Sequence, residues 1–221
     1  TLIYAILIFL VILTLVPFYL IMVNATHSSF EIVTQLNVFP GGYLKENYEK
    51  LQQYVNIWSG FFNSVLVSVL FTLISGYLGA LVAFGFEKYN FKGKTFLYAV
   101  VLASMMIPGQ VSIVGYYRMG LKMGLVNKLA TFCLPFFAPG VTSVSTIFFL
   151  RGMICQGVSD SLIEAARMEG CGEFKIFNKV VFPCILPGVA TMCIFNFVNS
   201  WNNYIGPLIM LTDTKKYTMP I

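Results

Sequence analysis

The chain has 221 residues, of which 57% are hydrophobic and only 10% are charged, and its net charge is +5. Soluble domains usually carry about 25% charged residues, so this composition excludes an ordinary soluble domain and indicates a membrane protein. The basic residues form no run suited to nucleic acid. The five cysteines form no CxxC pair, and His27 is the single histidine, so the sequence predicts small buried cysteines and no histidine-based metal site.

Five long segments lack Asp, Glu, Lys and Arg: 1–30, 51–86, 95–117, 129–150 and 180–212. A helix needs about 20 residues to cross the hydrocarbon core of a bilayer, and backbone groups in lipid must be hydrogen-bonded internally. We therefore predict an all-α, polytopic membrane fold with spans near 1–23, 60–86, 95–117, 129–150 and 181–211. The first segment is too long for a signal peptide, and no small-residue cleavage site follows it.

A polar insert at 24–59 separates the first two predicted spans. The letters FPGG at 39–42 are typical of a turn, and KENYEKLQQYV at 45–55 predicts a short surface helix. In the second span, small residues recur every fourth position, as Ser75, Gly79 and Ala83 on one row and Gly76 and Ala80 on another. Such rows let neighbouring helices approach closely.

Proline recurs inside the later spans, at positions 108, 135, 139, 187 and 207. Pro108 lies near the middle of 95–117 and would free the carbonyl of Ser104, which then needs a partner or a wet cavity. The segment is therefore either a packed kink or a cavity-lining element. Just before it, Gly93-Lys94-Thr95 looks like the end of a P-loop, but Lys88 stands where that motif requires glycine, so we predict no nucleotide site.

The last span is the most polar. Asn196, Asn199 and Asn203 follow helical spacing and surround Trp201, and a face of this kind should meet protein or water rather than lipid. Amides beside aromatic rings suit a hydroxyl-rich ligand, and they equally suit hydrogen bonds between helices. Both interpretations stay open for the candidate substrate-path residues Asn196, Asn199, Trp201 and Asn203.

A second insert, 151–180, holds the densest group of charges: 7 of the chain's 14 basic and 9 acidic residues lie in 160–179. Ser161 and Glu164 have the spacing of a capping box, and Gly170 lies where a glycine would end the helix. Leu162, Ala165, Ala166 and Glu169 share one side of this predicted helix. Its low alanine surface suits insertion into a groove on another protein.

The letters EAARMEGCGEFKIFNKVVFPCILPG, 164–188, resemble the EAA loop of binding-protein-dependent ABC importer permeases. Glu164, Ala165, Ala166 and Gly170 match the motif at its spacing, and Pro183 and Pro187 match its ending. Two positions depart from the pattern: Glu169 replaces the usual Asp, and Cys171 replaces the usual Ala. FKGK at 91–94, MIPGQ at 106–110, GLVN at 124–127 and WNNYIGPLIML at 201–211 resemble the carbohydrate-type permeases, in particular their maltose-permease-like second subunit.

The resemblance covers nearly the whole chain and implies one transmembrane domain of a type I ABC importer over 1–221, with a sixth span beyond Ile221. It implies that 24–59 is extracytoplasmic and that 151–180 is a cytoplasmic coupling loop; the Lys and Arg counts on the two sides are equal and give no orientation. The residues implied to couple to a separate ATPase are Glu164, Ala165, Ala166, Arg167, Glu169 and Gly170.

The implied function is ATP-driven carbohydrate import by alternating access across a bacterial cytoplasmic membrane. The implied partners are ATPase subunits, a second homologous permease, an extracytoplasmic solute-binding protein, a sugar and membrane lipid. ATP and Mg would bind the ATPase, and this chain would hold no cofactor or metal and would not be an enzyme. The alternatives are a permease for a non-sugar solute, a secondary transporter or channel, and an intramembrane enzyme. The charge-poor runs carry no intramembrane acid for ion coupling, and the chain has no HExxH or GxSxG motif.

Overall fold

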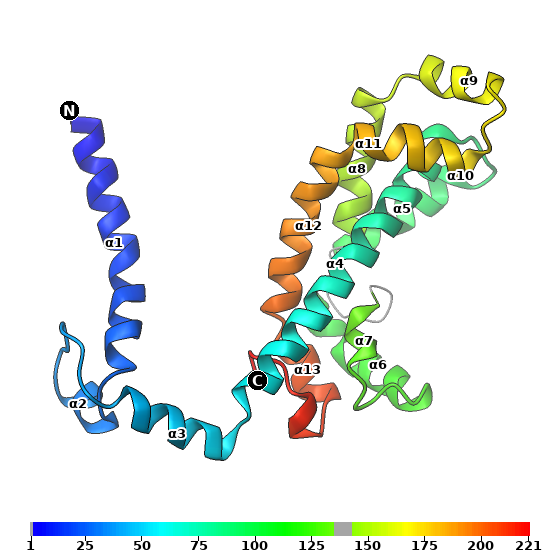
Figure 1. The fold of residues 1–221 in the computed structure, drawn as a ribbon. Helices are drawn as coiled ribbons and strands as arrows, with labels where there is room; N and C mark the ends of the chain where they lie inside the picture. Colours follow the sequence, from blue (N-terminus) through cyan, green and yellow to red (C-terminus); the bar gives the residue numbers. More distant parts are fainter. Residues whose placement is uncertain (1, 135–142) are drawn as a thin grey trace. The chain divides into compact units, whose positions relative to one another are not determined.

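The computed structural model describes residues 2–134 and 143–221, and every regular element in these ranges is a helix, so the predicted all-α class is confirmed (Figure 1). The described chain forms two compact units, 1–57 and 58–221. Unit 1 contains α1 (Leu2–Asn24), α2 (Ser29–Thr34) and α3 (Leu44–Tyr54). Unit 2 begins in α4 (Ile57–Lys88) and contains all later helices.

The helices that follow α4 are shorter. They are α5 (Lys94–Met105), α6 (Gly109–Lys122), α7 (Ala130–Cys133), α8 (Ser143–Gly157), α9 (Asp160–Met168) and α10 (Glu173–Ile176), then a π-helix (Phe177–Val181), α11 (Phe182–Cys184), α12 (Leu186–Trp201), α13 (Ile205–Met210) and a 3₁₀ turn (Thr214–Lys216).

In unit 1, the insert after α1 is ordered by local hydrogen bonds. The predicted surface helix is present as α3, and the FPGG segment before it contains bends at Phe39 and Gly42. Helix α2 was not predicted, although Ser28 and Glu31 form a complete capping box at its start. The Asn47 amide of α3 donates to the carbonyls of Ala25 and His27 at 2.9 and 2.8 Å, which joins α3 to the end of α1.

Two of the predicted spans are single long helices. α1 and α4 have 23 and 32 residues and are apolar and long enough to cross a membrane. A third candidate is the pair 173–184 and 186–201, which are bent by 81° at Ile185. Among the described residues no other helix passes this length test, so the count of five spans remains a prediction.

The predicted span 95–117 is divided at Pro108 rather than formed by one kinked helix. The chain forms α5, breaks at 106–108 and restarts as α6, with Pro108 at the N-cap. A proline is favourable there because it has no amide hydrogen to leave unpaired. The Ser104 carbonyl accepts the amide of Ile107 at 3.4 Å, so it is not freed. The fourth predicted span, 129–150, includes α7 and part of α8, but Pro135, Pro139 and the segment 135–142 lie outside the described residues.

The small residues of α4 do mark close helix contacts, as the sequence predicts. A Cβ on Gly79 would lie 2.7 Å from Thr146 Cγ2 of α8, and a Cβ on Gly76 would lie 2.8 Å from Cys193 Sγ of α12. Ala80 and Ala83 are fully buried in the same core. These contacts bring α8 and α12 onto α4 within a single packed cluster (Figure 1).

Candidate functional site

The charged loop folds into α9 and α10, two short helices joined at residues 169–172. Helix α9 begins at Asp160 with Ser159 as its N-cap, and the Ser159 side chain makes no capping bond. The capping box predicted for Ser161 and Glu164 is therefore wrong. The helix starts two residues earlier than expected, so Ser161 lies inside its first turn, where Asp160 also suits the positive end of the helix dipole.

The predicted end of α9 is confirmed. Gly170 has a φ of +75°, a left-handed conformation that glycine adopts without steric cost. Its amide donates to the Arg167 carbonyl at 2.9 Å, and the amide of Cys171 donates to the Ala166 carbonyl at 3.0 Å. This pair of bonds is a Schellman motif, and it turns the chain sharply from α9 toward α10.

The two alanines of the motif face different surroundings. Ile163 is buried, and Ala166 packs half-buried beside it on the core of unit 2. Ala165 is exposed, as are the other expected coupling residues Glu164, Arg167, Glu169 and Gly170. Two large apolar side chains of α9, Leu162 and Met168, are 43% and 89% exposed. Helix α9 thus packs Ile163 and Ala166 against the core of unit 2, and its remaining face, which is partly apolar and partly acidic, is exposed in this chain.

One end of α9 is held by the last residue of α4. Lys88 Nζ donates to the Val158 carbonyl oxygen and to Asp160 Oδ1, both at 2.6 Å. The Lys88 side chain is only 10% exposed, so this ion pair is better shielded from solvent on the lysine side than a free surface pair. The hydrogen bond from Lys88 holds the pKa of Asp160 below its ordinary value.

The other end of α9 is held through Glu173 of α10. Arg167 donates from Nε to Glu173 Oε1 at 2.7 Å and from Nη2 to Oε2 at 3.2 Å, a two-point contact of the kind that fixes geometry. The hydroxyl of Tyr89 also donates to Glu173 Oε2. The Arg167 and Tyr89 donors lower the pKa of Glu173. Burial, and then the Glu173 carboxylate, raise the pKa of Tyr89 to about 12, so the phenol keeps its proton.

Aromatic packing holds the rest of the loop on α4. Phe177, in the π-helix, is fully buried, and its ring lies 5.6 Å from Tyr77 and 5.7 Å from Phe84 between centroids. The Tyr77 hydroxyl donates to Asn178 Oδ1 at 3.0 Å. A π-helical turn widens the backbone and occurs often at functional sites. Here it precedes the 81° bend that leads into α12.

The sequence analysis did not predict the contacts that Lys88, Tyr89 and Glu173 make. The sequence shows charged residues at 87–94 and at 160–179, but it does not show which of them pair with each other. A polar hollow of about 290 Å³ lies where these segments meet, lined by Glu87, Lys88, Asn90 and side chains of α9. Its lining includes Asp160, Glu164 and Arg167, so it belongs to the same charged surface. Among the described residues no group of three His, Cys, Asp or Glu side chains is arranged to hold a metal ion.

The polar residues of the last predicted span do not form one face. Asn196 is fully buried in α12 and donates from Nδ2 to Thr146 Oγ1 at 3.1 Å and to Ser75 Oγ at 3.3 Å. It therefore joins α12 to α8 and α4. Asn203 lies beyond the end of α12 and accepts the Gly206 amide at 3.4 Å.

The other two candidate substrate-path residues lie closer to the surface. Asn199 is exposed, and its Nδ2 donates to the Phe195 carbonyl of its own helix at 2.9 Å. Trp201 is half-buried, stacked on Phe197 at 5.7 Å and edge-on to Phe61 at 5.9 Å. The structure thus places Asn196 in helix packing and leaves Asn199 and part of Trp201 exposed.

The family of the chain follows from residues 75–220, which match the model described as binding-protein-dependent transport system inner membrane component. The chain belongs to this family. The matched residues include the whole charged loop, so the resemblance read from its EAA motif is confirmed. Members of this family are inner membrane components of transport systems, which agrees with the prediction that this permease is not an enzyme.

Curated relatives of this permease cover most of the chain. The arabinooligosaccharides transport system permease protein AraQ of Bacillus subtilis is 29% identical over 95% of this chain and 74% of its own. The diacetylchitobiose uptake system permease protein NgcG of Streptomyces coelicolor is 30% identical over 98% and 70%. AraQ of Halalkalibacterium halodurans is 33% identical over 74% of this chain, which spans 57% of that relative's length.

The fold of the permease matches a solved transporter. A chain in the crystal structure of a bacterial ABC transporter involved in the import of the acidic polysaccharide alginate aligns with a TM-score of 0.78. The alignment covers 99% of this permease and 76% of that chain at 17% identity. The all-helical fold is therefore that of an ABC importer permease.

Proposed function

We propose that this chain is a transmembrane subunit of an ATP-driven carbohydrate importer. The observation that carries the proposal is the similarity to AraQ and NgcG over almost the entire chain, since the first name specifies transport of arabinooligosaccharides and the second uptake of diacetylchitobiose. Further relatives carry names for melibiose, raffinose and stachyose import and for glucose import. A non-sugar permease would have to be an exception among these relatives.

Helix α9 couples the permease to a separate ATPase subunit, which would bind ATP and Mg. The support is the match of Glu164, Ala165, Ala166 and Gly170 to the EAA motif, together with the uncovered face of α9. Exposed Leu162 and Met168 would supply the apolar part of that contact, and Glu164 and Glu169 the charged part. Arg167 acts differently, because its guanidinium is already bound to Glu173 and fixes the shape of the loop.

The proposed membrane arrangement has five spans in this chain and a sixth beyond Ile221, in a bacterial cytoplasmic membrane. α4 crosses the bilayer with its Lys88 end on the cytoplasmic side, where that lysine contacts the coupling loop. The insert before α4 is then extracytoplasmic and available to a solute-binding protein. A second homologous permease completes the path, as the family resemblance implies.

The sugar path includes Asn199, Trp201 and Asn203. Support comes from the exposure of Asn199 and the half-exposed ring of Trp201, because amides and aromatic faces are the groups that fix orientation in ligand sites. Asn196 would act from behind this surface by holding α12 against α4 and α8.

A co-purification experiment tests the coupling. The full-length chain is tagged in its host, and its partners are identified after mild solubilisation. We expect an ATPase and a second permease with the native chain, and loss of the ATPase with Ala165→Leu, which adds bulk on the uncovered face of α9. Gln53→Leu adds a similar exposed apolar group on α3 and should leave the complex intact. Retention of the ATPase by Ala165→Leu would contradict docking through α9.

The substrate is tested on the purified complex with its binding protein. ATP hydrolysis is measured with a panel of oligosaccharides, amino acids and polyamines. We expect stimulation by one or more oligosaccharides. Stimulation by a non-sugar solute alone would overturn the carbohydrate assignment and leave the ABC permease assignment standing.

A further inference from the structure

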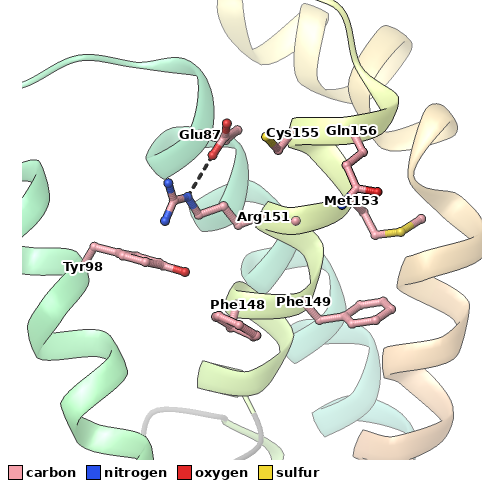
Figure 2. A pocket seen from close by; sticks show the side chains of 9 residues that line it. Glu87, Tyr98, Phe148, Phe149, Arg151, Met153, Cys155 and Gln156 are labelled. Carbon is pink, nitrogen blue, oxygen red and sulfur yellow. Dashed lines mark hydrogen bonds and ion pairs between the residues drawn. The ribbon is translucent and has the colours of Figure 1, made fainter.

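A second pocket of about 560 Å³ lies between the end of α4, helix α5 and helix α8, and its lining includes no residue of α9 or α10. Figure 2 shows its lining side chains, with Glu87 from α4, Tyr98 from α5 and Arg151 from α8 around the polar part, and Phe148 and Phe149 around the apolar part. None of these residues belongs to the EAA motif or to the proposed sugar path.

The guanidinium of Arg151 is held in place from two directions. Its Nε donates to Glu87 Oε2 at 2.8 Å, and its central carbon lies 4.1 Å from the centroid of the Tyr98 ring, a cation–π contact. The bond to Glu87 uses the Nε edge of the guanidinium, and the contact with Tyr98 uses its face. The terminal Nη atoms point away from α8 (Figure 2), in the fork arrangement that binds phosphate oxygens.

The surroundings of Arg151 carry an excess of positive charge. The lining holds one cation and one carboxylate, Arg151 and Glu87. Beside it, Lys94 donates to the backbone carbonyl oxygens of Tyr89 and Glu87 rather than to a carboxylate, so two basic groups stand near the single carboxylate of Glu87. An anion is favoured over a neutral or cationic ligand.

The depth of the pocket in the bilayer follows from the length of α4. Its 32 residues extend about 48 Å at 1.5 Å per residue, which exceeds the roughly 30 Å hydrocarbon core. Glu87, in its last turn, then lies at the level of the lipid headgroups, and Arg151 lies there with it. Phe148 and Phe149, one turn earlier on α8, are 53% and 40% exposed and reach toward the acyl chains.

We propose that this pocket binds the headgroup of an anionic phospholipid, with its phosphate on Arg151 and its acyl chains against Phe148 and Phe149. Basic pockets between membrane helices are known to take such headgroups. The proposal goes beyond sugar transport and depends on the proposed topology only for the leaflet. The lipid would brace α5 and α8 at the end of α4, beside the coupling loop.

The chain contains a probe for this site. Cys155 lines the pocket and is exposed, whereas Cys184 is exposed and outside it. The assembled transporter is reconstituted into nanodiscs of phosphatidylcholine alone or with phosphatidylglycerol. Labelling by a water-soluble maleimide is then followed at each cysteine by mass spectrometry. We expect phosphatidylglycerol to slow labelling of Cys155 roughly tenfold, as one charge-assisted hydrogen bond would, with no change at Cys184.

Two variants identify the binding group. Arg151→Gln should abolish the lipid dependence at Cys155, and Lys122→Gln, which removes a positive charge from α6 outside the pocket, should preserve it. An unchanged Cys184 rate and thermal unfolding temperature report that each variant is folded. A lipid dependence that survives Arg151→Gln would overturn the proposal.

Three further outcomes would also overturn it. Equal Cys155 labelling in both lipids would mean that no anionic lipid is selected. Equal protection in phosphatidylcholine discs by inorganic phosphate would identify a soluble phosphate compound as the ligand. Protection in the assembled transporter in both lipids, but not in the isolated chain, would mean that the second permease covers the pocket.

Discussion

Gly170 and Gly172 make a matched pair of positions for testing the end of α9. Both glycines are exposed, and a Cβ at either position would meet no atom within 4 Å. They differ in backbone conformation, because Gly170 has a φ of +75° and Gly172 has a φ of −69°. Replacing each by alanine therefore adds the same methyl group in the same loop and changes only the backbone strain.

The expected cost follows from these angles. A residue with a Cβ in the left-handed region is disfavoured by about 1–2 kcal/mol, whereas alanine at Gly172 should be neutral or stabilise by up to about 1 kcal/mol. A cost of 1–2 kcal/mol corresponds to a factor of about 5–30 in an equilibrium constant. Gly170→Ala should therefore raise the opened population of the α9 C-terminus by about that factor.

Amide hydrogen exchange measures this opening directly. The amides at positions 170 and 171 are both bonded in the Schellman motif, so their exchange should be about 5–30 times faster in Gly170→Ala and unchanged in Gly172→Ala. We expect transport to fall with Gly170→Ala alone. Equal exchange in the two variants, or faster exchange in Gly172→Ala, would refute the assignment of strain to Gly170.

Three other predictions concern packing and pH. Gly79→Ala should destabilise the protein by about 1–3 kcal/mol in thermal unfolding, because its methyl would lie 2.7 Å from a threonine methyl of α8; Gly85→Ala on the same helix, with open space around it, should not. Asn196→Leu should cost about 1–3 kcal/mol by removing the buried amide that donates to the Ser75 and Thr146 hydroxyls, and a stability equal to that of the native chain would contradict its role between helices. In unit 1, the carbonyl of Phe39 raises the pKa of His27 above its ordinary value of 6.5, and the backbone at Ser28 and then the His27 side chain lower the pKa of Glu31 below 4.5. The contribution of His27 to the stability of this segment is present below pH 6.5 and is lost as the pH rises through its raised pKa. The contribution of Glu31 is lost as the pH falls through its lowered pKa. Limited proteolysis of residues 24–43 should therefore be slowest between these two pKa values, and in His27→Gln its rate should no longer rise at high pH.

The long apolar helices could be predicted from the sequence because their signal is local. Twenty or more consecutive uncharged residues can satisfy their backbone in lipid only as a helix, which is why α1 and α4 lie close to their predicted bounds. The breaks were harder to predict. Pro108 can either kink a helix or begin a new one, and the structure has the second outcome, which nothing in residues 95–117 alone decides.

The two Ser-x-x-Glu patterns show where local reading fails. Ser28 and Glu31 form a true capping box at the start of α2, which was not predicted. Ser161 and Glu164 have the same spacing and do not form one. The start of α9 is fixed instead by contacts distant in sequence, because Lys88 binds Asp160 and the core buries Ile163. No pattern within 151–180 contains that information.

The sequence motif was enough to predict the coupling loop, but the sequence did not predict which residues attach the loop to the end of α4. Tyr89 and Glu173 are separated by 84 positions, and each is an ordinary surface residue by composition. Only the fold brings them together with Arg167.

The attachment of α9 through Lys88 and Tyr89 has a mechanical meaning. These are neighbouring residues, so α9 itself is attached at the end of α4, while Phe177 and Asn178 hold the following segment against Tyr77 and Phe84. A sideways force on α9 therefore acts on the last turns of α4 as a torque. Helix α4 is about 48 Å long, so tilting it by about 10° about its Lys88 end would displace its other end by roughly 8 Å. A movement of this size at the far end of α4 would carry Phe61, and with it the ring of Trp201 that it contacts, so a push on one side of the bilayer would be felt at the aromatic residues on the other.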